Sequence, residues 1–290
     1  MKLNFSREQI ESWKDKVHRR VPRLAVSTTR QALKFINDVG FCFAFKADHA
    51  ELPCLWHATC GQREPVMPEH THHDPRISFI WELKDRLPAE GKIYYGKLLK
   101  HRPTMVSLDF IADFYVLSGR TGIRDEYLRE FGRGKLSALG KEIMDALRDS
   151  SPQTTRGLKL ATSMHMRGDR QEFDRAMAEL QEKMFVVKSA EEKQPFSFVW
   201  APFSAYFPLQ VRHARKLHVE TARARVLAQY FRNQLVASVT SIRHLFGWSK
   251  PETYRALGAL VQQGVVSPNA RIENEPGHNY CLVQQGKSLN

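Results

Sequence analysis

The sequence predicts a mainly α protein with small β wings, built as tandem winged helix-turn-helix modules, and we expect three of them. Two observations support this prediction. The stretch Val219–Val283 runs in the order helix, short helix, third helix and two strands, which is typical of a winged helix. The stretch Leu136–Trp200 follows the same order, and two copies of one supersecondary unit indicate tandem modules. We place the modules at 1–135, 136–205 and 206–290.

The C-terminal module begins with a helix over Thr221–Leu235, where apolar residues recur at the three-to-four spacing of an amphipathic helix. A short second helix is expected over Val239–Leu245, and Phe246-Gly247-Trp248 makes the turn after it. Two helices joined by a short turn form the first half of the winged-helix order.

The third helix of this module opens with Ser249, whose side chain can cap the N–H of Glu252 while the Glu252 carboxylate reaches back to Ser249. A proline in the first turn is tolerated. Leu257, Leu260 and Val261 are expected to face the core. The side chains expected to face outward are Lys250, Glu252, Thr253 and Arg255.

The wing of the C-terminal module follows Gly264, which ends the third helix. Val265-Val266 and Tyr280–Val283 are expected to be two strands, because both are apolar and they flank a polar stretch. That stretch, Ser267–Asn279, contains Gly, Pro and Asn and is predicted to be the loop between them.

The middle module is expected to contain three helices, Leu136–Arg148, Thr154–Met164 and Gln171–Lys183, with the breaker Asp149-Ser150-Ser151-Pro152 after the first. Its wing is expected to consist of Phe185–Lys188 and Phe196–Trp200 across the polar tip Ser189–Pro195. Within the third helix, Phe173–Leu180 aligns with Thr253–Leu260 of the C-terminal module. This alignment matches Arg175 with Arg255 and Leu180 with Leu260.

The N-terminal 135 residues are less regular. The start, Met1–Val17, is predicted to be a polar amphipathic helix, and within the helical stretch Phe5–Arg19 Ser6 and Gln9 are expected to form a capping box. Ser27–Val39 is predicted to be a second helix. With the apolar run Phe41–Phe45 they could form the front of a degenerate winged helix. The aromatic-rich stretch Ile77–Gly119 has basic residues between its rings, as in proteins that stack unpaired bases. The alternative, which we favour, is that these rings form core.

The net charge of +13 and the pI near 9.7 indicate a polyanionic partner, because neutralising phosphates releases counterions. An anionic membrane is the alternative, but no apolar run of 18 residues occurs and the first residues do not resemble a signal peptide. Four irregularly placed cysteines do not form a disulfide framework. We therefore expect a cytoplasmic protein that binds double-stranded DNA and no membrane. Winged helices also mediate protein contacts, which is the competing interpretation.

The N-terminal part also contains residues that could hold a metal ion. Cys54, His57 and Cys60 have the spacing of metal ligands, with His49 or the histidines at 70, 72 and 73 as the fourth. The alternative is that the cysteines are buried as small apolar residues and the histidines are solvated. We favour the alternative and expect neither a metal nor a cofactor.

Candidate DNA-binding residues lie on the second and third helices of the two clearer modules, because the N-terminal end of a recognition helix points toward phosphates and base edges. Arg243 and Lys250 are predicted to contact phosphates, whereas Arg175 and Arg255 could equally form structural ion pairs. The full set is Arg156, Lys159, Arg170, Arg175, Arg243, His244, Ser249, Lys250, Thr253 and Arg255.

Three groups of residues resemble the AlkZ/YcaQ-like winged-helix family. They are Leu52–Trp56, Trp81–Asp85 with Gly91–Lys97, and Leu245–Trp248 with Thr253–Leu257. The best-understood members of that family are DNA glycosylases that unhook interstrand crosslinks and remove bulky alkylated bases. The resemblance spans about Ala32 to Val266, and it implies three tandem winged helices around a DNA-binding channel with no metal.

The sequence departs from that family at one decisive place. Active members carry a Gln-x-Gln or Gln-x-Asp motif just after an early helix, which activates the hydrolytic water. At the corresponding place this chain reads Gly40-Phe41-Cys42-Phe43-Ala44, and phenylalanine cannot polarise water. The resemblance therefore implies the architecture and DNA binding but assigns no catalytic residue. Among the residues of the aromatic-rich stretch, the carboxylates that could act as a general base are those of Glu82, Asp85, Asp109 and Asp113, and none has a partner at a diagnostic spacing.

Three functions follow as hypotheses. The first is a DNA-repair protein that resembles alkylation and crosslink glycosylases, with base excision left open. The second is a winged-helix transcriptional regulator without enzymatic activity. The third is a zinc-containing interaction protein built around Cys54, His57 and Cys60.

Overall fold

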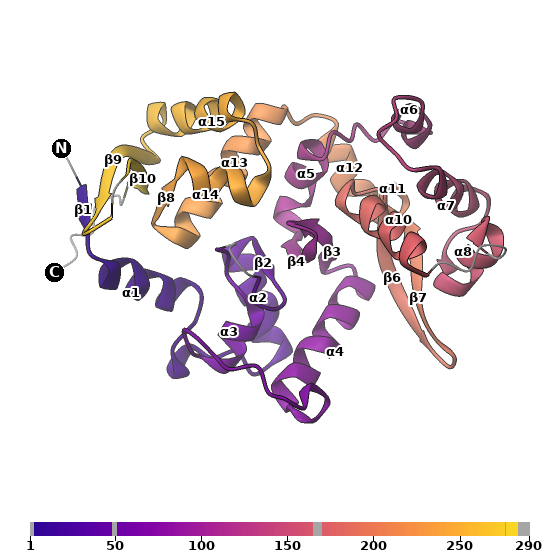
Figure 1. The fold of residues 1–290 in the computed structure, drawn as a ribbon, viewed down its shortest axis with the longest axis horizontal. Helices are drawn as coiled ribbons and strands as arrows, with labels where there is room; N and C mark the ends of the chain where they lie inside the picture. The colour runs from indigo at the N-terminus through magenta and orange to yellow at the C-terminus, as the bar shows by residue number, and fades with distance from the viewer. Residues whose placement is uncertain (1–2, 48–50, 165–169, 276, 284–290) are drawn as a thin grey trace. The chain divides into compact units, whose positions relative to one another are not determined.

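The computed structural model describes residues 3–47, 51–164, 170–275 and 277–283. The chain forms two compact units. One combines Met1–Ile77 with Val219–Asn290, and the other is Ser78–His218. The two ends of the sequence thus fold together, and the middle of the chain forms the second unit (Figure 1).

The first unit contains an N-terminal and a C-terminal set of elements. The N-terminal set is β1 (Leu3–Phe5), α1 (Arg7–Val17), a 3-10 turn (Pro22–Leu24), α2 (Thr29–Val39), β2 (Phe41–Phe43), α3 (Leu55–Cys60) and a second 3-10 turn (Thr71–His73). The C-terminal set is α13 (Val219–Gln234), β8 (Val236–Ser238), α14 (Val239–Phe246), α15 (Lys250–Gln262), β9 (Val266–Ile272) and β10 (Asn279–Leu282).

One sheet of this unit joins the two ends of the chain. Its strand order is β1-β9-β10-β8, and β1 runs parallel to β9 with Leu3 opposite Ala270. Two predictions are wrong here: Leu3–Phe5 is a strand and not the start of a helix, and Ser267–Ile272 belongs to β9 and not to a loop. Both errors have the same physical reason. Each segment forms a strand because its backbone hydrogen-bonds to the other segment, which lies at the far end of the sequence. The polar residues of Ser267–Ile272 lie on the exposed face of this strand, so its composition resembles that of a loop.

Buried polar side chains connect α13 to the N-terminal helices. The Asn233 amide donates to the Val39 carbonyl at the end of α2 (2.9 Å), and the Gln229 amide donates to the Asp38 carbonyl (3.2 Å). Nε2 of His18 lies 2.9 Å from the Asn233 carbonyl. Asn233 is fully buried and His18 nearly so. These groups satisfy carbonyls that would otherwise be buried without a donor, so they determine how the helices pack.

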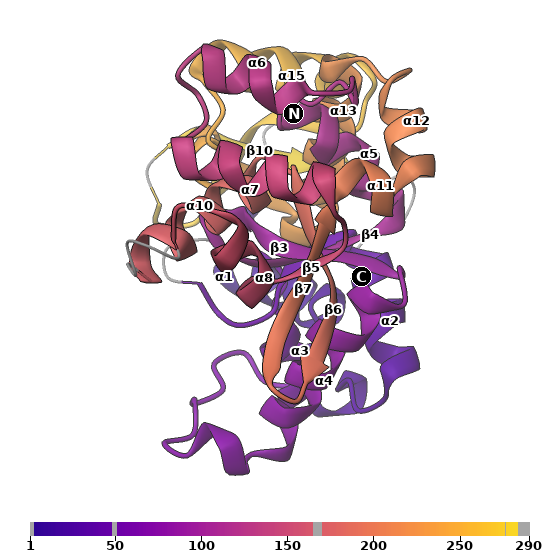
Figure 2. The same cartoon turned by 90° about the vertical axis from the view of Figure 1, so that its right-hand side faces the viewer.

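The second unit contains most of α4 (Pro75–Ala89), which begins in the first. The remaining elements are β3 (Ile93–Leu99), β4 (Arg102–Ser107), α5 (Leu108–Leu117), α6 (Glu126–Gly132), α7 (Ala138–Asp149), β5 (Gln153–Thr154), α8 (Thr155–Ala161), α10 (Arg170–Glu182), β6 (Val186–Lys193), β7 (Phe196–Pro202), α11 (Phe203–Tyr206) and α12 (Pro208–Ala214). The β6–β7 hairpin is longer than predicted and extends beyond α8 and α10 (Figure 2).

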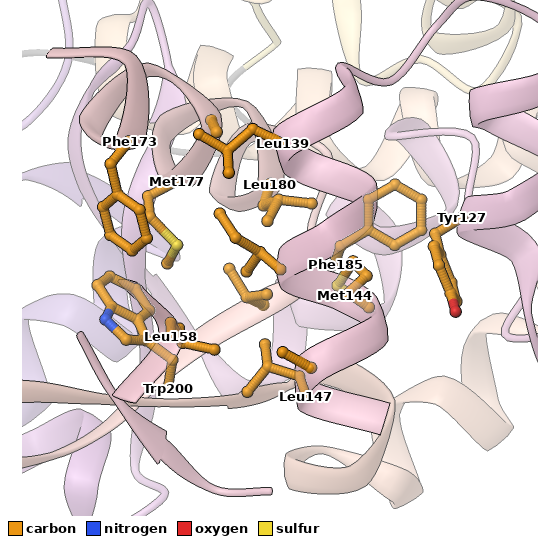
Figure 3. Packing of buried hydrophobic residues seen from close by; sticks show 14 of the residues in the cluster. Tyr127, Leu139, Met144, Leu147, Leu158, Phe173, Met177, Leu180, Phe185 and Trp200 are labelled. Carbon is orange, nitrogen blue, oxygen red and sulfur yellow. The ribbon is translucent and has the colours of Figure 1, made fainter. Parts of the chain in front are cut away.

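The core of this unit lies between α7, α8, α10 and the hairpin. Phe173, Met177 and Leu180 of α10 face Leu158 and Trp200 across it, as Figure 3 shows. All of these side chains are at most 6% exposed. Met177 and Leu180, which align with the predicted core residues Leu257 and Leu260, thus lie on the face of α10 that packs.

The two units contain the same element order. Among the described residues, each unit contains a run in the order helix, strand, helix, helix, strand, strand. In the second unit the run is α7, β5, α8, α10, β6 and β7, and in the first it is α13, β8, α14, α15, β9 and β10. In both sheets the third strand lies between the other two, as β5-β7-β6 and β8-β10-β9. The protein is thus mainly helical with small, mostly antiparallel sheets, as predicted.

The described residues contain no helix that is both long enough and apolar enough to span a membrane.

Stability should depend on the neutral form of His18. Burial, with Arg20 and Lys14 nearby, holds the pKa of His18 well below its ordinary value. The unfolded chain therefore binds more protons as the pH falls below about 6.5, and the free energy of unfolding should decrease by about 1 kcal/mol between pH 7 and 5.5. Urea unfolding of the wild type and of His18→Gln, whose amide can still donate to Asn233, measures this difference.

The variant should show the smaller pH dependence of the two. His57, whose pKa burial lowers to about 4, adds the same residual slope to both proteins. Equal slopes for wild type and His18→Gln would contradict the assignment of His18 as a buried neutral group.

Candidate nucleic-acid interface

The start of α15 is defined by a capping box, as predicted. The Ser249 hydroxyl accepts from the Glu252 N–H (3.4 Å), and the Glu252 carboxylate accepts from the Ser249 N–H (2.8 Å). The Ser249 hydroxyl and N–H, followed by Arg223, hold the pKa of Glu252 below its ordinary value. Ser249 is thus exposed but has a capping role, which fixes where the helix begins.

Two exposed cations lie beside this helix start. Lys250 is the first residue of α15, and Arg243 belongs to the last turn of α14. Neither has a carboxylate within 4 Å among the described residues, and Nε of Arg243 donates only to the Trp248 carbonyl at 3.4 Å. His244 is exposed next to Arg243. Cations without an acidic partner are available to a bound anion.

The nearby arginines of the same unit are paired. Arg223 on α13 is 5% exposed, and its guanidinium contacts Glu252 (2.8 Å) and Glu220 (2.9 Å) while lying 5.5 Å from the Trp248 ring centroid. Arg255 is 3.5 Å from Glu220 in a pair whose members are both well exposed. The sequence prediction did not select Arg223, although it precedes the apolar residues Leu227 and Tyr230 by four and seven positions on the same helix face.

Thr253 is misplaced by the prediction. Its side chain is fully buried, and its hydroxyl donates to the Ser249 carbonyl (2.9 Å). The reason is helical spacing, because Thr253, Leu257 and Leu260 lie at i, i+4 and i+7 on the core face. The aligned residue Phe173 of α10 is also buried, so the sequence repeat contained the signal.

Tyr254 is an exposed residue that the prediction did not select. It is 46% exposed and follows Lys250 by one helical turn. Gly258 follows by another turn, and a Cβ there would meet no atom within 4 Å. One exposed face of α15 therefore presents, at successive turns, the ammonium of Lys250, the ring of Tyr254 and the backbone of Gly258.

The corresponding cations of α8 and α10 are more scattered. Arg156 is exposed, and Lys159 lies 5.0 Å from the Phe173 ring centroid. Arg170 is 3.8 Å from Asp174, and Nε of Arg175 donates to the Gln171 carbonyl at 3.3 Å. All four lie on α8 or α10, and residues 165–169 between the two helices lie outside the described residues.

The hairpin of the second unit has a buried charged anchor. Lys188 on β6 is 4% exposed and binds the carboxylates of Asp85 and Glu191, with its ammonium 4.4 Å from the Phe198 ring centroid. Phe196 near the tip is instead 64% exposed. The base of the hairpin is thus fixed to α4 while its end remains accessible.

The place of the expected catalytic motif is core. Phe41, Cys42 and Phe43 form β2 and are at most 1% exposed. Burial raises the pKa of the Cys42 thiol well above its ordinary value. These side chains therefore stabilise the fold and cannot activate water.

The possible metal ligands lie at or next to α3: Cys54 immediately precedes this helix, and His57 and Cys60 belong to it. The Cys54 thiol, whose pKa burial raises to about 12, donates to the Ala44 carbonyl at 3.8 Å. In the described part of the chain, no three His, Cys, Asp or Glu side chains are grouped so that they could hold a metal ion. His49 lies outside those residues. The described geometry gives the zinc hypothesis no support.

The geometry defines a basic, mainly helical protein with an exposed cationic helix start in a repeated helix–sheet unit. The sequence from 26 to 247 matches the model of the AlkZ-related family, and because the match covers most of the chain, this protein belongs to that family. The predicted resemblance is confirmed.

The fold is similar to that of a solved structure, the Streptomyces sahachiroi DNA glycosylase AlkZ. The TM-score is 0.62 at 14% sequence identity, and the similarity covers 97% of this chain and 70% of that one. No curated protein matches the sequence with significant similarity.

Two substitutions that each remove one positive charge beside Glu220 should differ in stability. Arg223→Ala removes a buried guanidinium that pairs with Glu252 and Glu220 and lies over the Trp248 ring, so the free energy of unfolding should fall by about 2 kcal/mol. Arg255→Ala breaks an exposed pair and should cost less than about 1 kcal/mol. Chemical denaturation of both variants tests this, and an equal loss would show that Arg223 has no special packing role.

Proposed function

We propose that this protein binds double-stranded DNA as a member of the DNA-repair type of its family, with the start of α15 as the principal contact. The observation that carries the proposal is the pair Lys250 and Arg243, which are exposed and without carboxylate partners in the described residues. The net charge of +13 supports a polyanionic partner. The structurally similar Streptomyces protein is a DNA glycosylase.

The repeated element order supports a winged-helix interpretation of both copies. In such a module the third helix enters the major groove, with its N-terminal residues nearest the bases and phosphates. Lys250 then contacts a phosphate, and Tyr254 lies one turn further along the groove. Arg255 can exchange its exposed pair with Glu220 for a phosphate at little cost.

The second copy is proposed as an additional contact. Arg156 and Arg175 are exposed on α8 and α10, and neither has a carboxylate within 4 Å among the described residues. The accessible Phe196 lies near the tip of the hairpin. Arg170 and Lys159 would contribute positive charge nearby. A third module over 1–135, and the boundaries at 136–205 and 206–290, remain part of the proposal.

Base excision by the water-activating motif of the family is not part of the proposed function. The observation behind this is the burial of Phe41, Cys42 and Phe43, where no amide or carboxylate is present. This favours a protein that binds DNA without cleaving the glycosidic bond. A non-enzymatic regulator is the second candidate for the same reason.

Duplex binding should be strongly electrostatic and should depend on α15. The logarithm of the affinity should fall with the logarithm of salt concentration with a slope of magnitude about 4 or more if roughly five phosphates are contacted. Lys250→Ala and Arg243→Ala should each weaken binding to every sequence and reduce the slope by about one. Fluorescence anisotropy with a labelled 20-base-pair duplex across a salt series measures both quantities.

The matched control is Arg30→Ala, which removes an exposed charge from α2, away from the start of α15. An unchanged affinity of the Lys250→Ala/Arg243→Ala double variant would exclude α15 as the reader, and the second copy would then have to bind the DNA.

An excision assay should give a negative result. Duplexes containing alkylated bases or an interstrand crosslink should bind but release no base, because β2 presents no group that could activate water. Chromatography of the reaction products detects free base directly. Base release would show that other residues supply the chemistry, whereas a consensus from a random-site selection without base release would favour the regulator.

A further inference from the structure

A cleft of about 630 Å³ lies within the second unit, and its lining residues all belong to that unit. Its walls are the loop 122–126, the end of α7, and the segment of α11 and α12. Clefts of several hundred cubic ångströms with an apolar lining and a few polar groups are typical small-molecule sites. None of the residues selected from the sequence as DNA contacts lines it.

The inner wall of the cleft is apolar. It is formed by Met144 and Leu147 of α7 with Phe185 and Phe203, and Tyr127 closes one end. Figure 3 shows Met144, Leu147, Phe185 and Tyr127 along one side of the core of this unit. Such a wall suits a flat ring, which it can cover without leaving polar groups unsatisfied.

The rim of the cleft is cationic. Arg124, Arg148, Arg212 and Arg215 line it, together with the carboxylates of Asp125 and Glu126. Glu126 accepts from the N–H and hydroxyl of Thr121. Asp125 has only distant contacts, 3.9 Å to Arg124 and 3.7 Å to Arg148.

Arg212 is the arginine best placed to bind a ligand. It is exposed, and no carboxylate lies within 4 Å of it among the described residues. Arg215, by contrast, donates to the Gly122 carbonyl. Arg148 also lies 3.9 Å from Asp145 and 3.6 Å from Asp149, in pairs that are partly exposed. Arg212 is thus the rim arginine with neither an acidic nor a carbonyl partner in the described residues, and guanidinium groups bind phosphate in two-pronged geometry.

The loop that forms one wall is held in place. Gly122 has a φ of +69°, and a Cβ at this position would lie 2.5 Å from Cγ1 of Val211 on α12. The backbone of the loop therefore approaches α12 closely, and the Arg215 contact fastens the same residue. The cleft is thus bounded by packed residues rather than by a free loop.

We propose that this cleft binds a nucleotide, with the base against the apolar wall and the phosphate at Arg212 and Arg148. The inference rests on the proposed function for preferring a nucleotide to other anionic aromatic compounds. The nucleotide is supplied either free in solution or as an unpaired residue of a DNA strand, and base stacking on aromatic walls with cations along the backbone suits both.

Isothermal titration calorimetry of the full chain tests the ligand class. The probes are thymidine 5′-monophosphate, thymidine, inorganic phosphate and single-stranded pentathymidylate. The monophosphate should bind at least about tenfold more tightly than thymidine or phosphate alone, because each lacks one half of the contacts. Tighter binding of pentathymidylate identifies the strand as the source, and equal binding identifies the free nucleotide. Phosphate binding as tightly as the monophosphate would overturn the proposal.

Variants locate the binding in the cleft. Arg212→Ala should weaken monophosphate binding about tenfold or more, and Ala205→Trp, at an exposed position lining the cleft, should block it by filling the space. The control Arg129→Ala removes an exposed arginine of α6 that does not line the cleft. Equal affinities in all three variants would overturn the proposal.

The same proteins separate this inference from the proposed function. If the cleft variants lose monophosphate binding and the wild type does not bind duplex, the cleft assignment is supported and the proposed duplex binding is contradicted. If duplex binding requires Lys250 but Arg212→Ala and Ala205→Trp leave the monophosphate affinity unchanged, only the cleft assignment is contradicted.

Discussion

The proposed DNA-binding surface depends on one buried guanidinium, that of Arg223. Its ion pair with Glu252 and its position over Trp248 join α13 to the start of α15, and a second ion pair, with Glu220, lies within α13. Because these two carboxylates are occupied, Lys250 and Arg243 have no acidic neighbour within 4 Å among the described residues. The cations at the helix start are therefore left to an external anion, and the turn that presents them is fixed by packing.

Local features of the fold could be predicted from the sequence, whereas distant pairings could not. Ser6 with Gln9 and Ser249 with Glu252 cap their helices as expected, because each box requires residues only three positions apart. The pairing of Leu3 with Ala270 joins segments at opposite ends of the chain. No local pattern marks either segment as a strand, since each is ordered by the other.

The candidate site shows the same division. The exposure of Lys250 and Arg243 follows from helical periodicity. The burial of the Arg223 guanidinium, and the position of Arg212 at the rim of the cleft without a carboxylate within 4 Å among the described residues, depend on tertiary packing. The burial of Thr253 could have been predicted from the sequence, since its aligned partner Phe173 is apolar. The departure at Phe41–Phe43 was also visible in the sequence, and the structure adds the reason, which is that these residues form core in a member of the AlkZ-related family.

The central claim is that the first turn of α15 meets duplex DNA. Hydrogen–deuterium exchange with and without a saturating duplex tests it most directly, because it reports every backbone segment at once. Bound DNA should slow exchange over Val239–Tyr254 more than in α1 or α2. Protection confined to other segments, with exchange over Val239–Tyr254 unchanged by bound DNA, would contradict it.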